Sequence, residues 1–147
     1  MDIQICCRRE IPGLKNRTIE ANLAKVLGAL GCHDRELSVL LTTDADIARL
    51  NQGYLGREGA TNVLAFPMSG GPAPEVASAM LGDVVISVDT AVKESAVCGE
   101  ALHQTINRLL IHGVLHLLGY DHERSAAEAK RMEAAEGRLM AVVREGN

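Results

Sequence analysis

The sequence predicts a small α+β protein, in which about five helices pack on one sheet of four short strands. Strand-like and helix-like stretches follow one another along 147 residues, a length that suits a single domain over residues 1–147. Hydrophobic residues make up 47% and charged residues 23% of the chain, as in ordinary globular domains. Aromatic residues make up only 2%, so aliphatic side chains must build the core.

The first half of the chain contains two strand–helix pairs. Residues 3–7 alternate between apolar and polar side chains, which indicates a strand. Apolar residues within 19–30 recur at helical spacing. Residues 37–41 form an apolar run typical of a buried strand. Thr43 and Asp46 then resemble a capping box, which predicts a short second helix.

The second half adds two strands and three helices. Strands are expected at residues 63–66 and 81–89, because both runs are rich in apolar and β-branched side chains. Residues 67–80 hold three prolines and two adjacent glycines, which favour a mobile loop. The three helices are expected at residues 90–98, at residues 100–118, and after a capping box of Ser125 and Glu128, with Met132, Leu139 and Val143 inward.

The charge of the chain gives no general reason to bind nucleic acid. Fifteen basic and 19 acidic residues leave a net charge of −4, and there is no polybasic run. We therefore expect no DNA partner, and a polyanion would need a local basic patch. The residues expected to form that patch, if the sheet brings them near the site below, are Arg8, Arg9, Lys15, Arg17 and Arg57.

The sequence favours a cytoplasmic protein. Its N-terminus starts with an acidic residue and lacks the apolar stretch of a signal peptide. No window is apolar for long enough to span a membrane, so no membrane partner is expected. The four cysteines are then expected to be reduced thiols within the core.

The most informative stretch is HGVLHLLGYDH, residues 112–122. His112 and His116 stand four residues apart on a predicted helix, so their rings share one face. Gly119 allows the helix to end and the chain to reverse, which returns His122 to the same point. Three imidazoles leave a fourth tetrahedral position open, as in catalytic zinc sites. The motif predicts one Zn²⁺ per chain; ordinary core or surface histidines are the alternative.

This spacing matches the zinc ligands of the metzincin proteases, whose motif also has a glutamate directly after the first histidine. That glutamate is the general base of peptide hydrolysis. Here Gly113 occupies its place. Because a positioned base contributes roughly 10²–10⁴-fold to the rate, the sequence predicts the same zincin-like metal site with a different chemistry.

The histidine motif resembles the signature of the YbeY family, bacterial rRNA maturation factors regarded as metal-dependent endoribonucleases. Two more blocks agree: TNVLAFP at residues 61–67 resembles the family's T-[DN]-V-L-S-F-P, and LGDVVIS at residues 81–87 resembles its L-G-D-[IV]-x-I-S. The resemblance implies a mixed sheet and cleavage of single-stranded rRNA in maturing the 16S 3′ end and in ribosome quality control. It implies the ribosome or its small subunit and assembly factors as partners, and zinc on His112, His116 and His122.

The chain departs from the family where an arginine usually precedes the threonine block by six residues. Leu55 stands there, and Arg57 is the candidate to reach the same space and hold the phosphate. Asp121 is a second candidate catalytic residue, which can orient a ligand ring or transfer a proton; a turn aspartate is the alternative. Two other functions remain open: a non-catalytic ribosome-associated assembly factor with a structural zinc, and a metallohydrolase of another substrate.

Overall fold

The computed structural model describes residues 2–32, 34–68 and 80–145. The described residues form four strands and five helices, which confirms the predicted α+β class. Their bounds are β1 (Asp2–Cys7), α1 (Asn16–Ala29), β2 (Glu36–Thr42), α2 (Asp44–Leu55), β3 (Val63–Pro67), β4 (Met80–Ser87), α4 (Val88–Cys98), α5 (Leu102–Leu117) and α6 (Ala126–Glu145).

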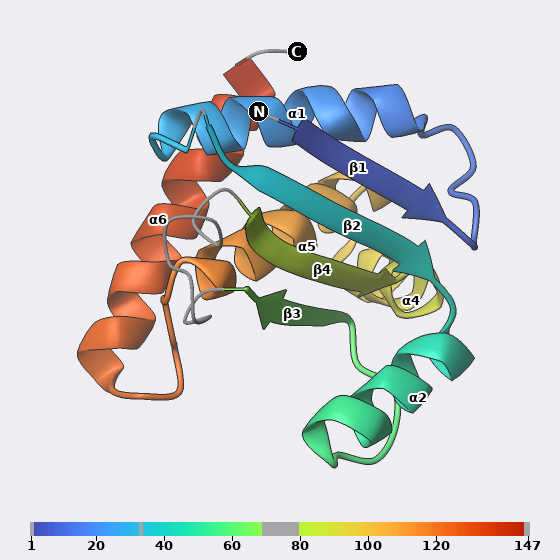
Figure 1. Ribbon diagram of the computed structural model, residues 1–147. Coiled ribbons are helices and arrows are strands. Elements are labelled where there is room, and N and C mark those ends of the chain that lie inside the picture. Colours follow the sequence, from blue (N-terminus) through green and yellow to red (C-terminus); the bar gives the residue numbers. More distant parts are fainter. Residues whose placement is uncertain (1, 33, 69–79, 146–147) are drawn as a thin grey trace.

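The four strands form one mixed sheet in the order β1-β2-β4-β3 (Figure 1). Strand β2 pairs in parallel with β1 on one side and with β4 on the other. Strand β3 pairs antiparallel to β4 and forms the edge of the sheet. The mixed sheet that the resemblance implied is therefore present, and one edge of β3 is left without a partner strand among the described residues.

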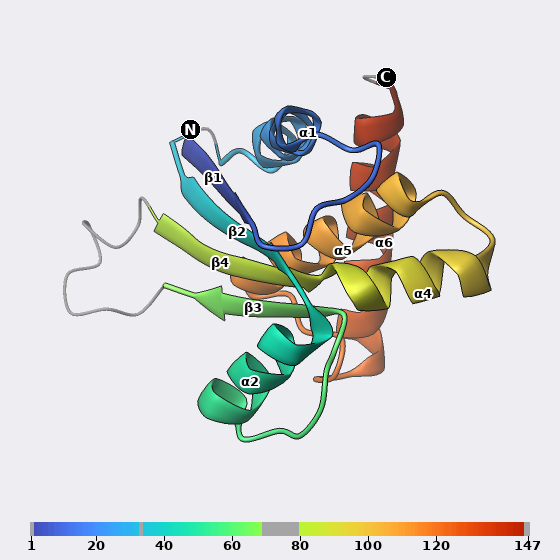
Figure 2. The same ribbon diagram turned by 90° about the vertical axis from the view of Figure 1, so that its right-hand side faces the viewer.

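Helices cover the two faces of the sheet unequally (Figure 2). Helices α1, α4, α5 and α6 lie on one face, where their apolar side chains and those of the sheet form the main core. Helix α5 is central in this layer, since it contacts β3, β4, α1, α4 and α6. Among the described helices, α2 alone packs on the other face, where Ile47 contacts Leu64 and Val85 in a small second cluster. This arrangement holds α5 firmly against the antiparallel edge of the sheet.

Several local predictions can be compared with the structure. The strand expected to run to residue 89 ends at Ser87, because the Ser87 hydroxyl accepts a hydrogen bond from the Thr90 amide and caps α4. Most of the expected loop at 67–80 lies outside the described residues. All four cysteines are free, but a core location is wrong for Cys6 and Cys98, which are exposed.

Within the described residues, no helix has both the length and the apolar character needed to cross a membrane.

Candidate metal centre

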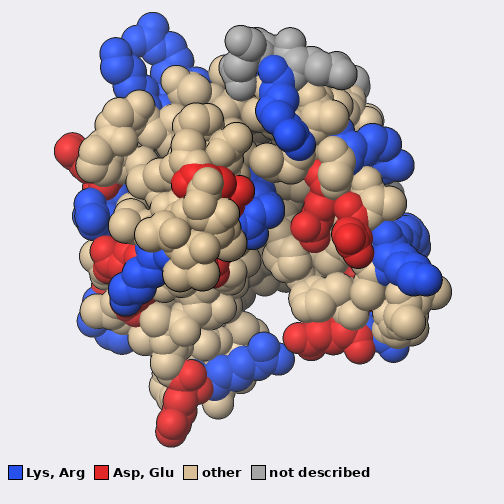
Figure 3. Space-filling view, turned by 180° about the vertical axis from the view of Figure 1, so that it is seen from behind, with Lys and Arg blue, Asp and Glu red and all other residues tan. Residues whose placement is uncertain are grey.

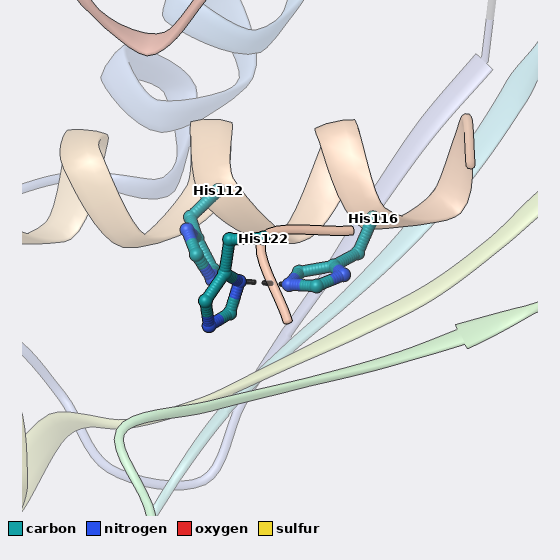
Figure 4. Close-up of side chains that lie close together, drawn as sticks. All are labelled: His112, His116 and His122. Carbon is teal, nitrogen blue, oxygen red and sulfur yellow. Dashed lines mark hydrogen bonds between the residues drawn. The ribbon is translucent and has the colours of Figure 1, made fainter. Parts of the chain in front are cut away.

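The end of α5 and the turn after it bring three histidine rings together (Figure 4). His112 and His116 are half-buried on the one side of α5 that is not packed into the core. The helix ends with Gly119 at φ 96°, and the Tyr120 amide donates to the Leu115 carbonyl, as in a Schellman turn. The reversal returns His122, whose ring centroid lies 5.4 and 5.5 Å from those of the other two rings.

The ring nitrogens of these three residues suit a single metal ion. One nitrogen from each lies within 4.8 Å of the others, and Nε2 of His112 is 3.1 Å from Nε2 of His116. Two nitrogens at zinc-ligand distance on a tetrahedral ion stand about 3.3 Å apart, so His112 and His116 already lie near this separation. The structure thus gathers the three predicted ligands into one group able to hold a metal, which we call the histidine cluster.

The pKa of His116 also favours the binding of a cation. Burial lowers the pKa of His116, and the neighbouring His112 and His122 rings lower it further. A neutral imidazole has the free lone pair that metal binding requires. At neutral pH the His116 ring therefore offers a nitrogen lone pair to a metal ion.

A carboxylate from α6 holds the back of one ring. Nδ1 of His112 lies 2.9 Å from Oε1 of Glu136, and each side chain is 25% exposed. Because a carboxylate only accepts, Nδ1 of His112 is the donor in this contact, and Nε2 is the nitrogen that can face a metal ion. No sequence pattern indicates this contact, since the two residues are 24 positions apart on different helices.

The histidine cluster forms one wall of a pocket of about 660 Å³. Strand β3, the end of α2 and the turn after α5 supply the other walls, and this region shows as a notch bordered by acidic and basic side chains (Figure 3). Arg57 and Arg124 line the pocket, and neither makes an ion pair with any described residue. Arg124 was not among the predicted site residues, because no motif marks it.

The backbone around Arg57 is fixed by a buried residue. The Arg57 amide donates to the carbonyl of Asn51, and the Asn51 side chain donates to the carbonyl of Gly59 at 3.0 Å. These two bonds hold the chain after α2 against the pocket. Leu55, which stands where the family has arginine, also lines the pocket and is 47% exposed.

The predicted basic patch does not form around the histidine cluster. Arg57 lines the pocket, but Arg8, Arg9, Lys15 and Arg17 do not. The physical reason is visible for two of them, since Arg8 pairs with Asp46 at 3.3 Å and Arg9 with Asp89 at 3.2 Å.

Asp121 lies in the wall of the pocket, where its role remains a prediction. Its Oδ1 accepts a hydrogen bond from the Glu123 amide at 2.9 Å, which is a turn contact. Among the described residues, the carboxylate that bonds a ring of the cluster is that of Glu136.

Gly113, which stands where the metzincin motif has its glutamate base, is packed closely against the sheet. A Cβ atom on Gly113 would lie 2.7 Å from Cγ1 of Val84 and 3.4 Å from Cγ2 of Val63. Any larger side chain there would push α5 away from the sheet. A glutamate at this position would therefore require α5 or the sheet to shift.

The fold and the cluster define a small α+β protein with a three-histidine group able to hold a metal. The family model described as Endoribonuclease YbeY matches residues 5–144, and the chain belongs to this family. It is 43% identical to the Endoribonuclease YbeY of Geobacter sulfurreducens over 99% of this chain and 98% of that protein. It is 42% identical to the protein of the same name from Aquifex aeolicus, over 78% of this chain and 74% of that protein.

A solved structure shares the fold. The solution structure of TM1509 from Thermotoga maritima superposes with a TM-score of 0.66, covering 96% of this chain and 88% of that chain. The two sequences are 24% identical, so the likeness concerns the architecture.

Proposed function

We propose that residues 1–147 act as one zinc-dependent endoribonuclease domain that cleaves single-stranded RNA. One observation carries the proposal: three ring nitrogens meet within 4.8 Å in the wall of a pocket that also holds two arginines. Neither arginine forms an ion pair within the described part of the chain. Family membership supports RNA as the substrate. The ion would be held by His112, His116 and His122.

In the proposed reaction, the residues of the pocket and the ion have separate roles. A divalent ion bound there supplies a Lewis acid for a phosphoryl oxygen and lowers the pKa of water. The guanidinium groups of Arg57 and Arg124 bind the phosphate from the end of α2 and from the turn after α5. Arg57 thereby replaces the cation that is missing at Leu55. Asp121, at the pocket wall, is our candidate to accept or return a proton.

We propose a biological role in the cytoplasm, in maturation of the 16S rRNA 3′ end and in ribosome quality control. Its partners would be the ribosome or its small subunit and assembly factors. The support is the family resemblance of the three sequence blocks and the match of the family model. The pocket volume of about 660 Å³ also lies within the range of about 300–1,000 Å³ that is typical of ligand sites.

The test is cleavage of a single-stranded RNA with the 16S 3′-end sequence by the zinc-loaded full chain. His116→Ala is compared with His103→Ala, because His103 is exposed in the first turn of the same helix. We expect His116→Ala to lose at least 100-fold in kcat/KM and His103→Ala to match the wild type.

Three results would each overturn part of the proposal. Cleavage by His116→Ala at the wild-type rate would exclude the histidine cluster as the catalytic centre. Binding of one zinc per chain without cleavage by either protein would favour a non-catalytic ribosome-associated factor, which co-sedimentation with ribosomal subunits would then measure. Cleavage of a peptide or ester but not RNA would favour another metallohydrolase.

A further inference from the structure

The histidine cluster has a second layer, and it comes from a helix that carries none of the ligands. Nδ1 of His112 donates to Oε1 of Glu136 at 2.9 Å, while Nε2 of the same ring faces His116 at 3.1 Å. We propose that Glu136 is a positioning residue, which fixes the ring of His112 and strengthens its Nε2 as a metal ligand. This inference rests on the proposed function, because it presumes that the cluster binds a divalent ion.

The packing of α6 delivers the carboxylate to a defined place. Met132, Ala135 and Leu139 are buried and seat α6 in the main core beside α5. Glu136 directly follows Ala135 and borders this buried stripe, so its side chain reaches α5 from a rigid base. Half-burial of both partners shields the hydrogen bond from water and strengthens it.

The same helix also supports the turn that carries the third histidine. The guanidinium carbon of Arg131 lies 4.6 Å from the ring centroid of Tyr120, two residues before His122. Helix α6 thus contacts both parts of the cluster, the helix and the turn. Among the described residues, Glu136 is the one carboxylate that is hydrogen-bonded to a ring of the cluster.

If Glu136 only linked α6 to α5, its removal would have a different effect from the removal of a positioning residue. A purely structural hydrogen bond between two helices contributes to folding stability whether or not the metal is bound. A carboxylate behind a ligand histidine acts on the bound state, and its removal typically costs 10–100-fold in metal affinity. The two roles are therefore separated by measuring affinity and stability in the same variants.

The experiment measures Zn²⁺ affinity of the full chain by competition with a chromophoric chelator, and thermal unfolding in excess EDTA. We expect Glu136→Ala to bind Zn²⁺ 10–100-fold more weakly than the wild type. Glu136→Gln keeps an acceptor oxygen for Nδ1–H, so its loss should be clearly smaller. Glu133→Ala is the matched control, since it removes the same charge from an exposed position one turn earlier on α6.

The outcomes separate this inference from the function on which it rests. An affinity of Glu136→Ala within twofold of that of Glu133→Ala overturns the positioning role, while the zinc site itself stands. An equal loss in Glu136→Gln and Glu136→Ala contradicts positioning through the hydrogen bond, and the Gln variant also serves if the Ala variant fails to fold. If the wild type binds no zinc, or His116→Ala binds it as tightly, the proposed function fails together with this inference.

Discussion

Two clusters of ionisable side chains lie on this sheet, and they differ in what satisfies them. The histidine cluster stands beside the antiparallel edge strand β3. The second, which we call the acidic cluster, consists of Asp44, Asp46 and Asp89 at the carboxyl ends of β2 and β4. In open α/β sheets, ligands usually bind at the carboxyl ends of the parallel strands. Here the carboxylates at that end are bonded to other side chains of the protein, and the candidate site is elsewhere.

The acidic cluster is saturated by the chain itself. Oδ1 of Asp44 accepts from the hydroxyls of Ser87 and Thr90, at 2.5 and 2.6 Å, and its Oδ2 lies 3.3 Å from Nζ of Lys93. The carboxylates of Asp46 and Asp89 each pair with an arginine that follows β1. The ion pairs are Arg8 with Asp46 and Arg9 with Asp89.

On its ligand side the histidine cluster is bonded to no carboxylate or cation among the described residues; Nε2 of His112 and Nε2 of His116 meet each other at 3.1 Å. Its ring nitrogens face one another, and the arginines nearest to it in the pocket, Arg57 and Arg124, make no ion pair with the described residues. The contrast between the acidic cluster and the histidine cluster shows that the number of charged groups does not identify a binding site. Groups whose donors and acceptors are already matched stabilise the fold, whereas unmatched groups around a pocket are free for a ligand.

The largest effect should come from removing one ligand histidine. Zinc at 100 times its Kd should raise the unfolding free energy of the wild type by about 2.7 kcal/mol, because the ion binds only the folded chain. His116→Ala should lose this increase, and His103→Ala should keep it. Thermal unfolding with and without zinc measures the difference. Excess chelator should leave the wild type folded, since the acidic cluster and the core need no metal; unfolding on chelation would indicate a structural ion.

A large effect on the fold beneath the cluster is expected from Gly113→Ala. The new Cβ would lie 2.7 Å from Cγ1 of Val84, so α5 or β4 must shift, at a cost of about 1–3 kcal/mol. Gly137→Ala is the matched control, because a Cβ there meets no atom within 4 Å and should stabilise α6 slightly. Urea denaturation of both variants measures the two effects. A Gly113→Ala protein as stable as the wild type would contradict the close approach of α5 to the sheet.

The part of the site that was predictable from the sequence is the part with local geometry. Helical spacing and one glycine place His112, His116 and His122 together, and all three lie within eleven residues. Glu136 was missed because its contact depends on how α6 packs against α5. Arg124 lies near the motif, but an exposed turn arginine has no distinguishing pattern.

The fold shows the same division between local and long-range information. The element types and most boundaries follow from periodicity and caps, as the Thr43 side chain illustrates by accepting from the Asp46 amide. The end of β4 was misplaced because Ser87 was not recognised as the cap of α4. The expected basic patch was wrong because the sequence does not reveal that Arg8 and Arg9 meet aspartates from distant segments.

A smaller effect is expected from the unpaired arginines of the pocket. Arg57→Ala and Arg124→Ala should each lower kcat/KM for RNA about tenfold, because one charge-assisted hydrogen bond to phosphate is lost. Each should also reduce the salt dependence of RNA binding by about one charge, without a change in zinc affinity. Arg138→Ala is the control for charge, since Arg138 is exposed on α6 and does not line the pocket. Equal losses in the control would indicate a general electrostatic effect.

The smallest effect is expected from Asp44→Asn, which tests the acidic cluster. The hydrogen bonds from Ser87 and then Thr90 lower the pKa of Asp44 below its ordinary value of 3.8. A pKa that is lower in the folded chain than in the unfolded one stabilises the fold above pH 3.8, and this contribution is lost as the pH falls through the folded pKa. Asparagine retains an acceptor oxygen but no charge, so the loss at pH 7 should be about 1 kcal/mol.

Urea denaturation at pH 7, 5, 4 and 3 measures this difference. The unfolding free energies of the wild type and Asp44→Asn should differ by a constant amount at pH 7 and 5 and converge below pH 4. Asp34→Asn removes the same charge from an exposed position and should differ from the wild type by less than about 0.5 kcal/mol at pH 7. A gap that persisted undiminished at pH 3 would mean that Asp44 acts through packing. The acidic cluster would then differ from the histidine cluster in shape and not in the matching of its charges.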